Sequence, residues 1–387
     1  MNTDNLSALA VGIGVVALIA GFGVYFNNPD LNRAASGQQQ QPDTFVPATI
    51  TENGTMTKLH IDKSQFRFAP ELAGISGYIN TADGQKITLA DLKGKVVIVD
   101  FWTYSCINCI RTIPYLNAWY DKYGDDGLVI VGVHTPEFEF EKNYDNVKTA
   151  VEKFGIKYPV VQDNDKGTWN AYQNRYWPHK YIVDDEGYIR YDHIGEGGYA
   201  DTEKIIQSLL AERAANTGTN ATIDKSISNP EKAQGVDFGK IYTPELYFGY
   251  QYAREPLGNT EGFRPDQVVK YSIPQDTNLL PNRIFLEGEW KNNADNMELQ
   301  SDTGRIVLFY SAKAANIVAG SQGTLQVSED NSKITNASRG SDVSDQGDAV
   351  IHGQKLYNLT MHDGYGEHRL VIDVTGKGFQ IYTFTFG

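Results

Sequence analysis

The stretch VVIVDFWTYSCINCIRTIP, residues 96–114, joins an apolar run to a helical pattern and contains the only two cysteines of the 387-residue sequence. Residues 96–102 are predicted to form a buried central strand, because continuous apolar runs are typical of such strands. The helical spacing of apolar residues then runs from Cys106 to Tyr123. Cys106 and Cys109 are therefore expected at a helix N-terminus, where free N–H groups and the helix dipole favour a thiolate. Two thiols at this spacing can close and reopen a small disulfide, so the pair predicts thiol–disulfide exchange.

Other roles for the cysteine pair are weaker. A zinc site needs about four ligands, and neither a second cysteine pair nor a suitably spaced histidine pair accompanies this one, so no metal is predicted here. Covalent haem attachment needs histidine after the second cysteine, where Ile110 stands, and no cofactor is predicted. A static structural disulfide stays open as an alternative, although so short a loop would stabilise the fold only weakly.

Composition and one apolar segment predict location. The net charge of -14 argues against nucleic acid as a partner and against binding to an anionic membrane surface. Residues 8–26 carry no charge and are long enough to span a bilayer, which predicts an uncleaved single-pass anchor, with a cleaved signal peptide as the alternative. Protein disulfides persist mainly outside the cytosol, so the domains are expected on the extracytoplasmic side of the cell membrane. Arg33, after the span, is a weak contrary signal.

The rest of the chain divides by composition and pattern. The first globular block alternates strand and helix signals in the order β-α-β-α-β-β-α, which predicts a mixed sheet with helices on both faces. The last block has nine short strand signals separated by turn residues, which predicts a β-sandwich of jelly-roll type. The expected organisation is an anchor (1–26), a flexible tether (27–57), an α/β domain (58–213), a linker (214–236) and a β-sandwich (237–387).

The sequence around the cysteines resembles thioredoxin, in which Asp-Phe-Trp begins six residues before the nucleophile, as it does here at Asp100. Further motifs resemble the extracytoplasmic part of the DipZ family. They are FWTYSCINC at 101–109, HTPEF at 134–138, WP at 177–178, GEG at 195–197, APEL at 69–72 and TPELYFG at 243–249. The resemblance covers nearly everything after residue 58. It implies a TlpA-like thioredoxin fold followed by a carbohydrate-module-like β-sandwich.

The sequence departs from that family in its membrane part. Many DipZ proteins begin with a multi-span, CcdA-like electron-carrying domain, whereas this chain has one predicted span without cysteine. A separate membrane electron donor, such as a CcdA-like protein, or a different redox direction is therefore implied. Disulfide-bearing client proteins are the other expected partners.

The catalytic roles are expected to divide among three residues. Cys106, at the exposed helix start, is the expected nucleophile, and Cys109, one turn inside, is expected to resolve the mixed disulfide. Asp100 ends the buried strand, where a desolvated carboxylate can take a proton from Cys109. Ordinary strand-end hydrogen bonding by Asp100 is the alternative.

The expected substrate-binding residues surround the pair. The resemblance implies a cis peptide bond before Pro178 that faces the cysteines and pairs with an extended substrate. Trp102, Tyr104 and Trp177 are expected to wall the site, with core packing as the alternative for each. His134 could approach the site from the end of its strand, although a structural histidine is the simpler interpretation.

Three functions follow from these features. The first is a membrane-tethered thiol–disulfide oxidoreductase that exchanges or reduces protein disulfides. The second is a thiol peroxidase, because Thr103-x-x-Cys106 resembles part of the peroxiredoxin signature, although Val99 stands where that signature has proline. The third is a binding protein that acts through its β-sandwich, with a glycan as a possible ligand. The sequence leaves open the redox direction, the client and the ligand of the sandwich.

Overall fold

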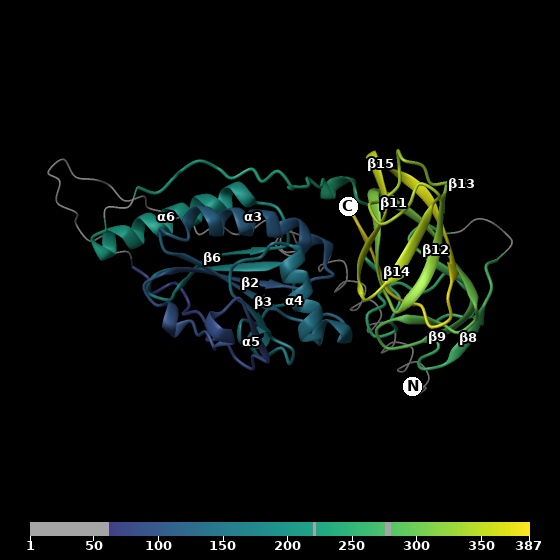
Figure 1. The fold of residues 1–387 in the computed structure, drawn as a ribbon, viewed down its shortest axis with the longest axis horizontal. Coiled ribbons are helices and arrows are strands. Elements are labelled where there is room, and N and C mark those ends of the chain that lie inside the picture. Colours follow the sequence, from purple (N-terminus) through teal and green to yellow (C-terminus); the bar gives the residue numbers. More distant parts are fainter. Residues whose placement is uncertain (1–61, 220–221, 275–279) are drawn as a thin grey trace, which may run out of the picture.

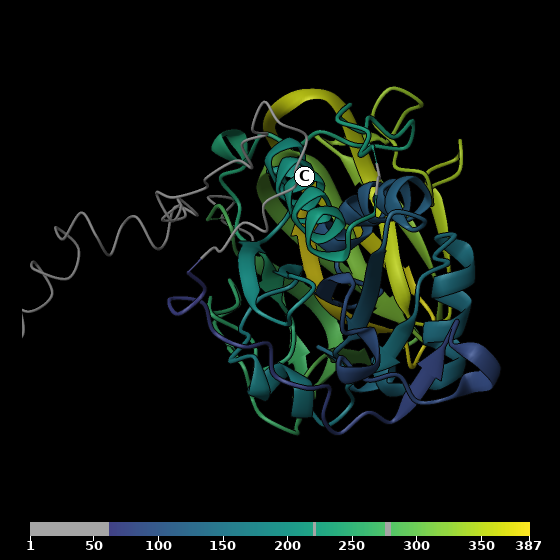
Figure 2. The same ribbon diagram turned by 90° about the vertical axis from the view of Figure 1, so that its left-hand side faces the viewer.

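The computed structural model of the protein describes residues 62–219, 222–274 and 280–387. Within them an α/β domain lies beside a β-rich domain (Figure 1). Figure 2 views the molecule from the α/β side, with the β-rich domain behind. The predicted span (8–26) and tether (27–57) lie outside the described residues. Among the residues that the structure describes, no helix is both long and apolar enough to cross a bilayer.

The α/β domain is built on a six-stranded mixed sheet with the order β1-β4-β3-β2-β5-β6. The central strands β2, β3 and β4 run parallel, and β1, β5 and β6 pair antiparallel to their neighbours. All seven residues of β2 are buried, as its apolar run predicts. The predicted mixed sheet is confirmed. The strands are β1 (Gly77–Ile79), β2 (Val96–Trp102), β3 (Leu128–His134), β4 (Val160–Gln162), β5 (His179–Val183) and β6 (Ile189–Ile194).

Alternate residues of β2 enter two different cores, because successive strand side chains point to opposite faces. Ile98 joins a core that also holds apolar residues of α3 (Ile107–Tyr123), α4 (Tyr144–Lys153) and α6 (Tyr199–Thr217). Val99 joins the core of the opposite face, where α5 (Gly167–Ala171) contributes Trp169. Helices α3 and α4, which connect the parallel strands, thus cover the same face of the sheet. This follows because both strand–helix–strand connections have the same hand and step in the same direction across the sheet.

Parts of this domain differ from the helices and strands that the sequence pattern predicts, because local interactions decide where they begin and end. The pattern at Phe138–Phe154 predicts one helix, but the structure has a 3-10 turn, η3 (Glu139–Lys142), before α4. The break falls at Asn143, whose side-chain oxygen accepts from the N–H groups of Asp145 and Asn146 and so begins a new helix. The sequence pattern also missed β1 and α5, which are only three and five residues long.

The β-rich domain holds ten strands in one hydrogen-bonded sheet among the described residues. Strand β9 pairs both with β10 and with the first half of β11, while β16 pairs with β10 and with the second half of β11. These pairings fold the sheet over on itself around a single apolar core. The strands are β7 (Leu246–Tyr247), β8 (Val268–Tyr271), β9 (Ile284–Asn292), β10 (Met297–Leu299), β11 (Thr303–Gly320), β12 (Gln322–Glu329), β13 (Ser332–Lys333), β14 (Asp348–His352), β15 (Lys355–Thr375) and β16 (Gln380–Phe386). A 3-10 turn, η4 (Phe238–Lys240), precedes them.

Two long strands replace four predicted short ones. The expected breaks near residues 311–315 and 360–367 lie inside β11 and β15, which pair along nearly their whole length. The register shifts between Ala312 and Ala314, where the partner strand carries extra residues. Such bulges bend a strand without ending it, and the pattern of apolar residues alone does not distinguish a bend from a turn.

The two domains share a continuous apolar contact. Tyr382 of β16 packs against Phe138 and Phe140, with ring centroids 5.1 and 4.7 Å apart, and it belongs to the same core as α3. The hydroxyl of Tyr252 donates to the carbonyl oxygen of Glu137 at 3.0 Å, and the hydroxyl of Tyr104 donates to that of Gln354 at 3.3 Å. The β-rich domain is therefore packed against the cysteine-bearing end of the α/β domain.

The segment between the domains follows the α/β surface over its described part. Helix α6 extends into the predicted linker and ends at Thr217. Further along, the N–H of Ser228 donates to Glu203 at 2.7 Å, and Gln207 donates to the carbonyl oxygen of Ser226 at 3.0 Å. These bonds hold the connection on α6.

Tyr382→Ala should weaken the coupling between the two domains, so that they unfold in separate steps. Removing a buried aromatic side chain typically costs about 3–5 kcal/mol, and here most of the lost contact lies between domains. Thermal unfolding followed by circular dichroism should show a lower first transition and two resolved steps. Tyr242→Ala, at a position 70% exposed in the same domain, is the matched control and should leave the melting curve unchanged. An unaltered curve for Tyr382→Ala would contradict a coupling role for this contact.

Candidate active site

Cys106 lies at the N-terminus of α3, as its sequence context predicts. It is the N-cap residue, with φ -76° and ψ 117°, and its sulfur accepts a hydrogen bond from the Cys109 N–H at 3.4 Å. The side chain is only partly buried, and both cysteines are free thiols. The helix end thus directs a backbone donor and the positive end of its dipole at the sulfur that solvent can reach.

Cys109 is one turn further into the helix and is buried. Burial raises the pKa of the Cys109 thiol well above its usual range, and the neighbouring Cys106 and the charge of Asp100 raise it further. A thiol with a raised pKa is a poor nucleophile until a base takes its proton. The two cysteines therefore differ in the way that an attacking and a resolving thiol require.

Asp100 is 2% exposed and lies on β2, behind the cysteines. Its Oδ1 has no hydrogen-bond partner among the described residues, so ordinary strand-end bonding does not account for that atom. Burial raises the pKa of the Asp100 carboxyl to about 7, and the charge of Lys180 opposes the rise. A carboxyl that titrates near neutral pH beside a buried thiol can serve as a proton acceptor.

Lys180 is a charged neighbour of Asp100 that the sequence pattern did not predict. It lies opposite Asp100 in the β2–β5 pairing, is fully buried, and donates from Nζ to the carbonyl oxygen of Gly195 at 3.1 Å. Burial lowers the pKa of the Lys180 ammonium, and the Asp100 carboxylate opposes that effect. The available signal was a lysine next to the apolar residues of the strand His179–Val183. Lysine is almost never fully buried unless it is paired, so its position in a buried strand indicates a charged partner.

Trp177 and Pro178 face the cysteines. The bond between them is cis, as the resemblance implies, and the Cys106 sulfur lies 4.0 Å from the Trp177 carbonyl oxygen. The Trp177 indole donates to the carbonyl oxygen of Thr135 at 3.0 Å and packs against the tilted ring of Trp169, with ring centroids 4.2 Å apart. These contacts fix the ring of the residue whose carbonyl oxygen faces the Cys106 sulfur.

The other two predicted wall residues are buried. Trp102 is 2% exposed and meets the ring of His134 edge-on at 5.2 Å. Tyr104 is 5% exposed, stacks on the same ring at 5.7 Å, and lines a cavity of about 440 Å³ between the domains. Neither ring forms an open wall at Cys106 comparable to that of Trp177.

His134 has no access to the cysteines as a base. It is fully buried, and its Nε2 lies 3.3 Å from the hydroxyl of Thr103. Burial lowers the pKa of the His134 imidazole to about 3, so the ring is neutral at physiological pH. The environment of His134 therefore supports a structural role for this residue.

A buried ion pair explains the GEG motif at 195–197. Arg111 of α3 donates from Nε to Glu196 at 2.9 Å and from Nη2 to the side chain of Asn108 at 2.8 Å. Asn108 is one of the two residues between the cysteines, so Glu196 holds the turn of the active site through Arg111. The two residues are 85 positions apart, so no local sequence pattern indicates the pair.

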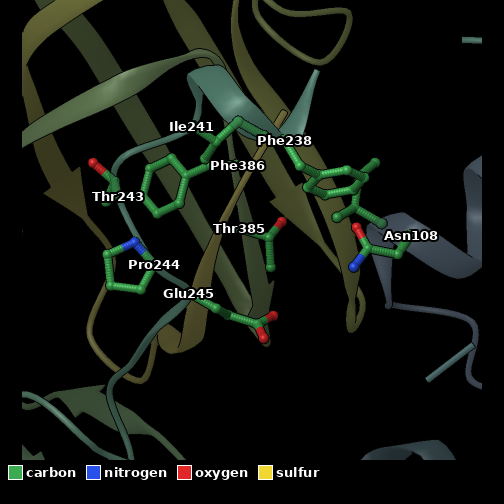
Figure 3. Close-up of a pocket in the computed structure, with 9 residues that line it drawn as sticks. Asn108, Phe238, Ile241, Thr243, Pro244, Glu245, Thr385 and Phe386 are labelled. Carbon is green, nitrogen blue, oxygen red and sulfur yellow. The ribbon is translucent and has the colours of Figure 1, made fainter. Parts of the chain in front are cut away.

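The β-rich domain supplies one side of a cavity beside the cysteines. This cavity, of about 260 Å³, is lined by Ile107 and Asn108 and, from the other domain, by Phe238, Ile241, Thr243, Pro244, Glu245, Thr385 and Phe386. Figure 3 shows Asn108 on one side, with Glu245 and Thr385 across from it. The hydroxyl of Thr385 is buried without a partner among the described residues. The cavity thus combines apolar side chains with several polar groups that could orient a ligand.

Two carboxyl groups and one phenol join the domains near this cavity. The Tyr247 hydroxyl lies 2.7 Å from Glu137 and 2.9 Å from Glu245. Burial raises the pKa of both carboxyls, and their mutual repulsion raises that of Glu137 further. Because one hydroxyl carries a single hydrogen, it can donate fully to only one of the two carboxyls at a time.

Comparison with known proteins finds relatives of both domains. The family model described as AhpC/TSA family matches residues 69–192, and the one described as thioredoxin-like C-terminal domain matches residues 243–387. Protein DipZ of Mycobacterium tuberculosis is 36% identical over 319 residues, which are 82% of this chain and 43% of that protein. The thiol-disulfide oxidoreductase YkuV of Bacillus subtilis is 32% identical over 144 residues, which are 37% of this chain and 94% of YkuV. The chain belongs to the DipZ family of the thioredoxin superfamily.

The shared part is limited in extent. The chain spans less than half the length of the DipZ proteins that it matches. Among solved structures, a thioredoxin-like protein in its oxidized form aligns with 38% of this chain and 97% of its own, with 31% identity and a TM-score of 0.35. The cysteine-bearing domain is that of a thiol–disulfide oxidoreductase, as the pair of thiols predicts.

Proposed function

We propose that this protein reduces or exchanges disulfides in extracytoplasmic client proteins, with Cys106 as the nucleophile. The Cys106 thiolate attacks one sulfur of a client disulfide, and the other client sulfur leaves as a thiolate. Cys109 then passes its proton to Asp100 and attacks Cys106, which releases the client as a dithiol. The protein is left with a Cys106–Cys109 disulfide, so two electrons have moved to the client.

One observation carries the proposal: the two thiols lie in opposite environments on one helical turn. Cys106 is reachable and accepts an N–H, while Cys109 is buried near an ionisable carboxyl with a pKa of about 7. A static bridge would need neither this asymmetry nor a proton acceptor. Trp177 and Pro178 are proposed to pair with the client segment, and the cavity lined by Asn108 and Glu245 to receive a side chain of it.

Insulin reduction tests the proposed function directly. The protein from residue 58 onward, supplied with dithiothreitol, should precipitate insulin chains faster than dithiothreitol alone, because Cys106 can attack the disulfide and Cys109 can resolve the adduct within one molecule. Turbidity follows the reaction. A rate equal to that of the reagent blank would reject the exchange function.

The membrane placement is a proposal of its own. Residues 8–26 are proposed to hold both domains outside the cytoplasm, with a CcdA-like membrane protein returning electrons to the Cys106–Cys109 disulfide. Protease added to intact cells should then digest residues 58–387, and immunoblotting measures the loss. Protection until the cells are lysed would place the domains in the cytoplasm.

Thiol peroxidase activity is the second candidate, favoured by the AhpC/TSA match at 69–192. That chemistry would use the hydroxyl of Thr103 to orient a peroxide at Cys106. Here the hydroxyl contacts His134 instead, and the residue is fully buried. Consumption of hydrogen peroxide by Cys109→Ser at the wild-type rate would favour the peroxidase over the exchanger.

The β-rich domain is proposed to be the carbohydrate-module-like sandwich that the family resemblance implies, with a glycan as its ligand. One part of this domain lies against the cysteine-bearing end of the α/β domain. Binding of residues 237–387 to a glycan array would support this role.

A further inference from the structure

Three metal-ligating side chains converge in the β-rich domain, outside the exchange site. His362 and His368 belong to β15, and Glu329 ends β12. One ligand atom from each lies within 4.8 Å of the other two. His362 Nε2 and Glu329 Oε2 are 3.0 Å apart, and the two imidazole rings stack at 3.9 Å with an angle of 2° between their planes.

A bulge in β15 brings the two histidines together. Gly366 pairs with Ala312 and Met361 pairs with Ala314, so residues 362–365 face a single residue of β11. The extra residues let the strand loop locally and place His362 against His368, six positions later. Glu329 approaches from the neighbouring strand, where it pairs with Leu370. A regular strand would separate these side chains, so the irregularity creates the cluster.

A second set of residues orients the ligand atoms. The Tyr310 hydroxyl donates to Glu329 Oε1 at 2.7 Å, which leaves Oε2 facing His362. His368 Nδ1 lies 3.0 Å from Asp330 Oδ2, and Asp330 is itself fixed by the N–H of Arg369 at 2.8 Å. A carboxylate on one histidine nitrogen sets the tautomer that leaves the other nitrogen free to bind a metal.

We propose that Glu329, His362 and His368 form a binding site for a divalent transition metal ion of the Zn²⁺ type. Two imidazole nitrogens and one carboxylate oxygen suit Zn²⁺, whereas Ca²⁺ and Mg²⁺ prefer all-oxygen sites. Zn²⁺ ligands at about 2.1 Å stand about 3.0–3.4 Å apart, which the His362–Glu329 distance already meets. Because an imidazole nitrogen binds a metal in the plane of its ring, metal binding requires one of the two parallel rings to turn toward the ion. Both histidine side chains are 16% exposed, so the ion can enter from solvent and keep an open coordination position.

Zn²⁺ titration by isothermal calorimetry tests the site. The full chain is used with Cys106→Ser and Cys109→Ser, because two reduced thiols would otherwise bind Zn²⁺ themselves. One equivalent should bind, and His362→Ala or His368→Ala should weaken the affinity at least about tenfold. His352→Ala, an exposed histidine of the same domain, is the matched control and should bind as the parent does.

A spectroscopic measurement makes the result independent of variant folding. Co²⁺ added to the parent protein should give visible absorption bands of a low-coordinate nitrogen and oxygen site, and Zn²⁺ should remove them. Glu329→Gln should lose the bands while its far-ultraviolet circular dichroism stays that of the parent. Absence of the bands, or equal Zn²⁺ affinity in the parent and in both histidine variants, would show that the cluster is a hydrogen-bonded network without a metal.

Discussion

Cys109→Ser should convert the protein into a trap for its clients, whereas Cys106→Ser should form no adducts. Cys106 is the reachable thiol, with the Cys109 N–H directed at its sulfur, and Cys109 is 1% exposed. Without Cys109 the mixed disulfide on Cys106 has no neighbouring thiol to release it. Insulin reduction should fall to the reagent blank in both variants.

Non-reducing electrophoresis with mass spectrometry measures the adducts. Bands from Cys109→Ser should disappear on addition of dithiothreitol, and the variant with both substitutions serves as the control that forms none. Adducts that accumulate with Cys106→Ser, or equally with both single variants, would reverse the assignment of the two roles.

Asp100→Asn should slow release of the mixed disulfide by about 10²–10⁴-fold, the usual contribution of a positioned base. The burial of Asp100 raises its pKa to about 7, so in the wild type the release rate should rise with pH through that value. Asparagine cannot accept the proton, so the variant should lack this step in its pH profile. Single-turnover release of a labelled client from Cys106 measures the rate. Asp201→Asn, an exposed site in α6, is the control.

The same carboxyl should make stability depend on pH. The pKa of Asp100 is raised from 3.8 to about 7 by burial, so the folded protein keeps a proton that the unfolded chain releases between these values. Stability therefore falls as pH rises from about 4 to about 7, by at most about 4 kcal/mol from this group. Asp100→Asn should remove that fall, so the variant gains stability relative to wild type as pH rises.

Urea denaturation at pH 5 and pH 8 measures the difference in the free energy of unfolding. Lys180 reduces the effect, because its ammonium stabilises the ionised carboxylate in the wild type and loses that partner in the variant. Parallel curves for wild type and Asp100→Asn across this range would contradict the raised pKa and the base role together.

Local sequence pattern was sufficient for the parts of this protein that depend on neighbours in the chain. The continuous apolar run at Val96–Trp102 predicted a buried strand, because side chains on both faces of a central strand are covered. The helical spacing after Cys106 placed the two thiols at a helix start. The buried apolar run placed Asp100 near the end of the preceding strand, close to the thiols. These features are set within about 20 residues, where spacing and burial pattern carry the information.

Contacts between distant residues decided the rest. Lys180 meets Asp100 only because β5 pairs with β2, and Glu196 reaches Arg111 across 85 positions. The bulge of β15, the contact of Tyr382 with Phe138 and Phe140, and the convergence of His362, His368 and Glu329 likewise depend on register and domain packing. The cysteines, their strand and their helix were therefore determined by the sequence by itself. The electrostatic surroundings of the cysteines and the second domain against them were decided only by the tertiary structure, because strand pairing brings together charges and rings that no local periodicity connects.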